Sequence, residues 1–135
     1  MKKEKACKIV FSDIDGTLLT SDGQITEGTK EMILNLEKKG IPFILTSARS
    51  PEGVRVIKRM LGNHAPIIAF CGGLILDNDG HEIYSKMIPL KRALELKAML
   101  DKDFPAVACN TFGGEKWIVD DRDDWREQRE EKIVG

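Results

Sequence analysis

Two carboxylates near the N-terminus, Asp13 and Asp15, have the clearest potential for chemistry in this sequence. They follow an apolar, β-forming run at residues 8–12 that predicts a buried strand. Side chains two residues apart on a strand lie on the same side, so the two carboxylates are expected to be neighbours. Such a pair repels unless a cation lies between them, and Mg2+ both binds carboxylate oxygens and attracts phosphate. One carboxylate is then suited to attack a phosphoryl group and the other to transfer a proton.

The residues after the carboxylates favour anion binding. Gly16 lets the backbone turn sharply and brings N–H groups close to an anion, and we predict that Gly16 and Thr17 contact phosphate. The alternative is a plain turn at Asp15 and Gly16, with Asp13 as a local cap. The position of the pair directly after an apolar strand favours the functional interpretation.

A second polar loop, Thr46–Arg49, follows another apolar run at residues 41–45. In parallel sheets ligands bind beyond the carboxyl ends of the strands, so this loop is expected beside Asp13. We predict that Ser47 and Arg49 contact phosphate oxygens there. The alternatives are a turn residue at Ser47 and a surface charge at Arg49.

A third loop, at residues 71–73, follows the strand predicted for residues 65–70 and reaches the same sheet edge. We predict that Gly72 contributes to phosphate binding. Cys71 is expected to be a small buried side chain, the alternative being a reactive thiol in an electropositive site.

The elements between these loops alternate between strands and helices. Thr26 is a plausible N-cap for a helix that ends near Lys39, and Ser50 with Pro51 begins another that ends near Gly62. This alternation predicts an α/β fold with a Rossmann-like parallel sheet and right-handed crossovers. A β-hairpin is predicted to follow at residues 74–77 and 82–85.

The last part of the chain has a different pattern, and we expect a domain boundary near residues 86–90, dividing the chain into 1–87 and 88–135. An amphipathic helix is predicted at residues 89–102, with Leu90, Leu94, Leu96, Met99 and Leu100 near one face. Two strands are predicted after it, at residues 106–111 and 116–119, and then a charged segment whose main apolar anchor is Trp125.

Composition excludes several classes of partner. The 135 residues carry 21 Lys and Arg against 22 Asp and Glu, so no basic excess points to nucleic acid or to a membrane surface. The three cysteines are widely spaced, which favours reduced thiols over disulfides. No apolar run is long enough to span a bilayer, and we predict a cytoplasmic protein.

Residues 13–19, Asp-Ile-Asp-Gly-Thr-Leu-Leu, resemble the first motif of the haloacid dehalogenase (HAD) superfamily, most of whose members are Mg2+-dependent phosphohydrolases. The resemblance implies that Asp13 is the nucleophile, which forms an aspartyl-phosphate. It implies that Asp15 is the general acid and base. It makes both residues metal ligands, Asp15 through its backbone carbonyl.

Other segments resemble the Cof-type phosphatase branch of this superfamily. Residues 45–49 are similar to its second motif, with Ser47 at the hydroxyl position and Ala48 in place of the usual glycine. Residues 71–73 stand where the branch usually has Asn-Gly-Ala, so one polar contact is missing. The segment from residue 88 resembles the beginning of an α+β cap domain. The resemblance thus implies an incomplete HAD-like core, a partial cap, and small phosphorylated metabolites such as sugar phosphates as substrates.

Two further motifs of the branch, a lysine and an acidic Gly-Asp-rich metal loop, are not found in this sequence. We therefore expect the chain alone to be weakly active or inactive, and a homo-oligomer is one way to cover the incomplete sheet. Lys86 and Lys91 are poor substitutes for the lysine. The remaining acids are either a displaced metal loop or, as we favour, the solvated start of a helix: Asp120, Asp121, Asp123 and Asp124.

Two other functions compete with the phosphatase interpretation. The first is a non-catalytic, oligomerising remnant that keeps only its phosphate-binding loops. The second is a receiver-type signalling domain, which would accept phosphate on an aspartate after a later strand. The strands near Leu45 and Phe70 end without an aspartate, which argues against the receiver.

Overall fold

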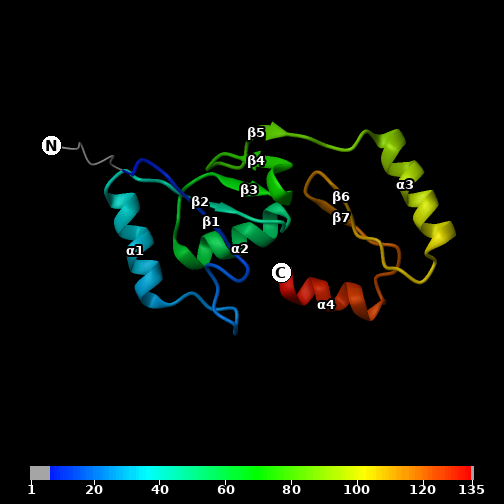
Figure 1. Ribbon diagram of the computed structural model, residues 1–135, viewed down its shortest axis with the longest axis horizontal. Helices are drawn as coiled ribbons and strands as arrows, with labels where there is room; N and C mark the ends of the chain where they lie inside the picture. The colour runs from blue at the N-terminus through cyan, green and yellow to red at the C-terminus, as the bar shows by residue number, and fades with distance from the viewer. Residues whose placement is uncertain (1–6, 135) are drawn as a thin grey trace. The chain divides into compact units, whose positions relative to one another are not determined.

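The structure is a computed structural model and describes residues 7–134. The chain forms two compact units, Met1–Ser85 and Lys86–Gly135. The first unit contains a five-stranded sheet and the second a two-stranded sheet (Figure 1).

The sheet of the first unit has the strand order β1-β2-β3-β4-β5. Three parallel strands form one side of it: β1 (Val10–Asp13), β2 (Phe43–Thr46) and β3 (Ile67–Ala69). An antiparallel hairpin, β4 (Leu74–Leu76) and β5 (Glu82–Ser85), continues the sheet beyond β3. The predicted α/β fold, with its parallel strands and the hairpin after them, is confirmed.

Two helices connect the parallel strands, and local capping decides where each begins. In α1 (Glu27–Lys38) and α2 (Pro51–Leu61), the hydroxyl oxygens of Thr26 and Ser50 accept hydrogen bonds from N–H groups of the first turn. Gly62 ends α2 in the left-handed conformation, with φ of 69°, which glycine adopts without the steric cost of a side chain. These boundaries agree with the sequence prediction.

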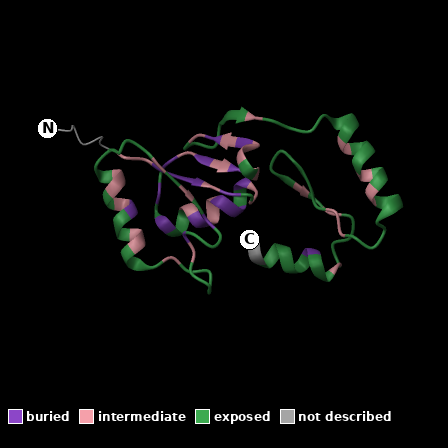
Figure 2. Ribbon diagram, in the orientation of Figure 1, coloured by how far each residue is buried: buried purple, intermediate pink, exposed green. Residues whose placement is uncertain are grey.

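The apolar core of the first unit lies around β2, β3 and α2, where buried residues are concentrated (Figure 2). Five residues of α2 are buried, consistent with an amphipathic helix that packs one face on a sheet. The buried core cluster consists of Ile14, Leu18, Ile33, Phe43, Leu45, Val54, Ile57, Leu61, Ile67, Ala69, Leu74 and Leu76.

The prediction of a buried first strand is wrong. Among residues 7–134, β1 is the edge strand of this sheet and pairs only with β2, so one of its sides has no neighbouring strand there. Phe11 is 56% exposed, and the strand alternates between half-buried and exposed residues. An apolar run predicts a strand, but its position within the sheet determines how much of it is covered.

The second unit consists of α3 (Leu90–Asp103), the antiparallel strands β6 (Thr111–Gly113) and β7 (Lys116–Ile118), and α4 (Trp125–Val134). The predicted strand at residues 106–111 is wrong, because β6 begins only at its last residue. Across the hairpin the rings of Phe112 and Trp117 stack, with centroids 6.0 Å apart.

The apolar positions of this unit are mostly uncovered. No residue of α3 is buried, and most of its predicted apolar stripe is exposed, with Leu100 half-buried. The prediction that Trp125 is an apolar anchor is wrong, because Trp125 is 67% exposed. Within the described part of the unit, Glu127 is the only buried residue. No helix in the described residues has the length and apolar character needed to cross a membrane.

Candidate functional site

The carboxyl ends of β1 and β2 bring the two predicted loops together. Asp13, the last residue of β1, is directly opposite Thr46, the last residue of β2. The loops that leave these strands therefore start side by side, as the parallel arrangement predicts. Asp13 is exposed at this edge.

The loop after β1 is anchored by one buried residue. Ile14 is completely buried, and its carbonyl oxygen accepts hydrogen bonds from the N–H groups of Leu18 at 3.0 Å and Leu19 at 3.1 Å. Gly16 has a φ of +74°, a conformation that other residues rarely adopt. Because β1 ends at Asp13, Asp15 lies in this turn, and strand alternation does not determine the direction of its side chain.

Arg49 connects the two loops through the carboxylate of Asp15. Its Nε donates to Asp15 Oδ2 at 2.9 Å and its Nη2 to Oδ1 at 2.7 Å, a two-pronged pair between residues 34 positions apart. The Arg49 side chain is 12% exposed and that of Asp15 is 57% exposed. The hydrogen bonds from Arg49 lower the pKa of Asp15 below its ordinary value, so Asp15 is ionised at neutral pH.

Ser47 maintains the shape of the second loop. It is buried, and its Oγ accepts a hydrogen bond from the N–H of Arg49 at 3.1 Å. This contact fits the turn interpretation of Ser47. Since the hydroxyl accepts in this bond, its proton can still be donated. Phosphate binding by Ser47 and Arg49 stays a prediction, as it does for Gly16, Thr17 and Gly72.

The third loop is held against the second by two backbone hydrogen bonds. The N–H of Phe70 donates to the Arg49 carbonyl at 3.0 Å, and that of Cys71 donates to the Ser47 carbonyl at 2.9 Å. Phe70 and Cys71 have φ of 49° and 54°, the left-handed region that costs non-glycine residues free energy. The prediction that Cys71 is buried is wrong, because these bonds fix a turn in which Cys71 is exposed.

A family model described as haloacid dehalogenase-like hydrolase matches residues 10–134. The chain belongs to the haloacid dehalogenase-like hydrolases. A Haemophilus influenzae protein named "Putative phosphatase" is 36% identical over 124 residues, which are 85% of this chain and 47% of that protein. The chain spans less than half the length of this and other curated relatives that it matches.

Solved structures of haloacid dehalogenase-like hydrolases share this fold. One from Bacteroides thetaiotaomicron has a TM-score of 0.84 and 21% identity, and the match covers 96% of this chain and 49% of that one. Another from B. subtilis has a TM-score of 0.78 and 24% identity, and the match covers 91% and 42% of the two chains. At this level of identity the likeness shows the fold alone.

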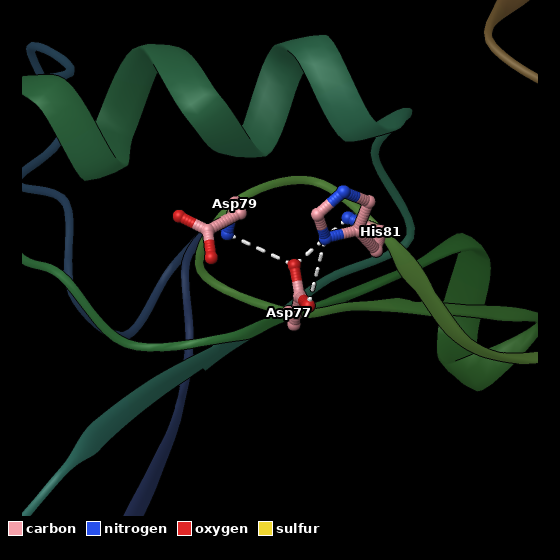
Figure 3. A group of neighbouring side chains, drawn as sticks. All are labelled: Asp77, Asp79 and His81. Atoms are coloured by element: carbon pink, nitrogen blue, oxygen red, sulfur yellow. Dashed lines mark hydrogen bonds and ion pairs between the residues drawn. The ribbon is translucent and has the colours of Figure 1, made fainter.

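The β4–β5 turn of this haloacid dehalogenase-like chain holds a cluster that was not predicted from the sequence: Asp77, Asp79 and His81, whose potential metal-ligand atoms all lie within 4.8 Å of one another (Figure 3). Asp77 Oδ1 accepts from the N–H groups of Asp79 at 2.9 Å and His81 at 2.8 Å. Its Oδ2 is 3.2 Å from His81 Nδ1. These hydrogen bonds lower the pKa of Asp77, chiefly through the His81 N–H, and they account for the cluster as the support of a tight turn.

Two of the four acids considered as a displaced metal loop are paired with cationic side chains instead. Asp120 Oδ2 lies 2.9 Å from Lys97 Nζ, and Asp124 binds the Arg126 guanidinium, with its closest contact at 2.6 Å. Asp124 also accepts from the N–H of Arg126 at 2.8 Å, at the start of α4. These contacts fit the start of a helix, the interpretation that the sequence favours.

Proposed function

We propose that this haloacid dehalogenase-like chain carries the nucleophile side of a Mg2+-dependent phosphohydrolase site for small phosphorylated metabolites such as sugar phosphates. The observation that carries the proposal is the two-pronged pair of Arg49 and Asp15, which joins the loops after β1 and β2 next to the exposed Asp13. The residues proposed as nucleophile and as acid and base, together with a guanidinium suited to phosphate, follow the carboxyl ends of β1 and β2, and this supports the proposal.

The proposed reaction has two displacements at phosphorus. An Asp13 carboxylate oxygen attacks the phosphoryl group, a new bond from phosphorus to this oxygen forms, and the bond to the leaving alcohol breaks. The leaving oxygen takes a proton from Asp15, which releases the alcohol. A water molecule then gives a proton to Asp15 and attacks phosphorus, which breaks the bond to Asp13 and releases phosphate.

Arg49 couples phosphate binding to the protonation of Asp15. While Arg49 holds Asp15, the lowered pKa of this carboxyl group keeps it ionised and unable to donate a proton. A phosphoryl group competes strongly with the Asp15 carboxylate for the guanidinium, because each of these two groups offers a pair of oxygens to the guanidinium N–H donors. In the proposed mechanism Arg49 moves to the phosphate, which removes the chief cause of the lowered pKa of Asp15, and the freed carboxylate takes up a proton from solvent that it then gives to the leaving oxygen.

The residues of this loop fit a magnesium ion in part. Asp13 offers an exposed carboxylate, and Asp15, whose carboxylate is bound to Arg49, offers its backbone carbonyl. Both are hard oxygen ligands, and Mg2+ commonly uses one or two carboxylates, substrate phosphate and several waters. When bound, the ion supplies positive charge that stabilises the transferring phosphoryl group.

The substrate class and the cellular compartment are parts of the same proposal. A Thermoplasma volcanium relative named phosphoglycolate phosphatase is 38% identical over 73 residues, which are 54% of this chain and 33% of that protein. This supports a small phosphorylated metabolite as substrate. The three cysteines, none in a disulfide, favour a reducing compartment, and we propose the cytoplasm.

Hydrolysis of p-nitrophenyl phosphate with Mg2+ and with EDTA tests the proposal. We expect slow Mg2+-dependent turnover that falls by about 10^3-fold or more in Asp13→Asn, the scale seen when a nucleophile is removed. The matched control is Asp79→Asn, which removes an exposed carboxylate elsewhere in the same unit and should leave the rate unchanged.

A second measurement distinguishes a site that turns over too slowly to detect from a wrong assignment of Asp13 as the nucleophile. Beryllium trifluoride bound to a carboxylate mimics an aspartyl-phosphate, and 19F NMR detects the adduct without turnover. We expect a Mg2+-dependent adduct that is absent in Asp13→Asn. Turnover that is unchanged in this variant, or an adduct that forms equally on it, would refute the role of Asp13.

A further inference from the structure

The second unit contains a pocket of about 460 Å³ between the C-terminal end of α3, the residues that follow it and the start of α4. Five carboxylates and two cationic side chains line it, so negative charge is in excess by three. Its apolar wall comes from the segment after α3, including Phe104 and Val107, which are 54% and 56% exposed. None of these residues belongs to the Asp13 site.

Both cations of the pocket are already bound to carboxylates. Lys97 contacts Asp101 and Asp120, and these bonds raise its pKa above the ordinary value. Arg126 binds Asp124 and donates to the Ala106 carbonyl oxygen at 2.6 Å. The positive charge that the pocket itself supplies is therefore engaged.

Glu127 interacts with the charge of the neighbouring Arg126, but one of its two carboxylate oxygens has no hydrogen bond. It is 4% exposed, it lines the pocket, and its Oε2 is buried without a hydrogen bond among the described residues. A buried carboxylate oxygen without a hydrogen bond is unfavourable, so this oxygen of a residue that lines the pocket calls for a donor from a ligand. The excess negative charge of the lining favours a cation.

The arrangement favours an organic cation over a metal ion. Within residues 7–134, the only group of three potential metal ligands whose atoms lie within 4.8 Å is Asp77, Asp79 and His81, which are not in this pocket. An ammonium group needs no such preformed set: one carboxylate and a few acceptors suffice, while an apolar wall covers its carbon chain.

We propose that this pocket binds the ammonium group of a small aliphatic amine, with Glu127 as its counter-ion. Glu127 accepts hydrogen bonds from the ammonium, and Phe104 and Val107 contact the methylene groups. The proposal is independent of the phosphohydrolase function, because it uses no residue of the Asp13 site.

Titration of the full chain with 1,4-diaminobutane, followed by 1H–15N NMR and calorimetry at low salt, tests this binding. We expect saturable binding, with shifts in residues 104–108 and 120–127 and none with uncharged 1,4-butanediol. Glu127→Gln keeps the side-chain shape but removes the charge, and should weaken binding by about tenfold or more. Glu130→Gln, an exposed position on the same helix with the same charge change, should bind like the parent, as should Asp13→Asn.

Several outcomes would overturn the proposal. Equal binding of the diol, or equal weakening by Glu130→Gln, would show nonspecific attraction. Binding of Mg2+ or Ca2+ that depends on Glu127, without binding of the amine, would assign the pocket to a metal. If circular dichroism shows that Glu127→Gln does not fold, the parent chain still tests the proposal, because binding of the diamine without binding of the diol requires recognition of the ammonium group.

Discussion

Helices α2 and α3 both carry apolar residues at helical spacing, more sharply segregated to one face in α2, and their surroundings in the structure differ. Five residues of α2 are buried, among them Val54, Ile57 and Leu61, whereas no residue of α3 is buried. The difference extends to the units that contain them. The first unit surrounds an apolar core, and the only buried residue in the described part of the second is a glutamate. An apolar stripe predicts which face of a helix is able to pack, but not whether another element covers it.

One ion pair from each unit shows how the sequence distance between partners matters. Arg126 and Asp124 are two residues apart, so one turn of chain is enough to bring them together. Arg49 and Asp15 are 34 residues apart and meet only because β1 and β2 are paired. A contact between residues distant in sequence depends on the core that aligns the strands, so the candidate active site depends on the stability of the first unit.

The largest expected difference between the units is in the cost of removing an apolar side chain. Leu45→Ala, in β2, removes a side chain that is 1% exposed and should lower the free energy of unfolding by about 2–5 kcal/mol. Leu94→Ala, in α3, removes one that is 62% exposed and should change it by less than about 0.5 kcal/mol. Urea denaturation followed by circular dichroism measures both, and similar costs would mean that Leu94 packs against something that the structure does not show.

A smaller effect is expected for the buried polar residue that joins α2 to the sheet. Asn63 Nδ2 donates to the Phe43 carbonyl at 2.7 Å, and its Oδ1 accepts from the Ala65 N–H at 2.6 Å. Asn63→Ala removes both of these buried hydrogen bonds and should cost about 1–3 kcal/mol in the same unfolding experiment. The control is Asn78→Ala, whose side chain contacts Lys58 at the surface and should matter little. An equal loss in both variants would contradict the assigned role of Asn63.

The smallest effect concerns the local ion pair of the second unit. The hydrogen bonds from Arg126 lower the pKa of Asp124 to about 2, from an ordinary value of 3.8. The stabilisation from this shift is complete above pH 3.8 and is lost as the pH falls toward 2, because protonation then breaks the pair. We expect Arg126→Gln to raise the pKa of Asp124 in a carboxyl 13C NMR titration, while the pKa of Asp15 stays unchanged. If the pKa of Asp124 stays near 2 in this variant, the shift comes from the hydrogen bond donated by the backbone N–H of residue 126 and not from the guanidinium.

Much of the first unit could be predicted from the sequence because the signals are local. Thr26 and Ser50 cap helices through hydrogen bonds that span three residues, and the hairpin connects strands that are neighbours in sequence. The loops after residues 13 and 46 lie at one edge because parallel strands place their carboxyl ends together. The motif at residues 13–19 also pointed to the haloacid dehalogenase superfamily, to which the chain belongs.

Only the tertiary structure decided which side chains are covered and which distant groups meet. The exposure of Phe11 and Cys71, the two-pronged pair of Arg49 with Asp15, and the burial of Glu127 leave no signal in the sequence. The physical reason is that burial and long-range pairing depend on the elements that pack around a residue, whereas caps, turns and strand alternation depend on residues a few positions away.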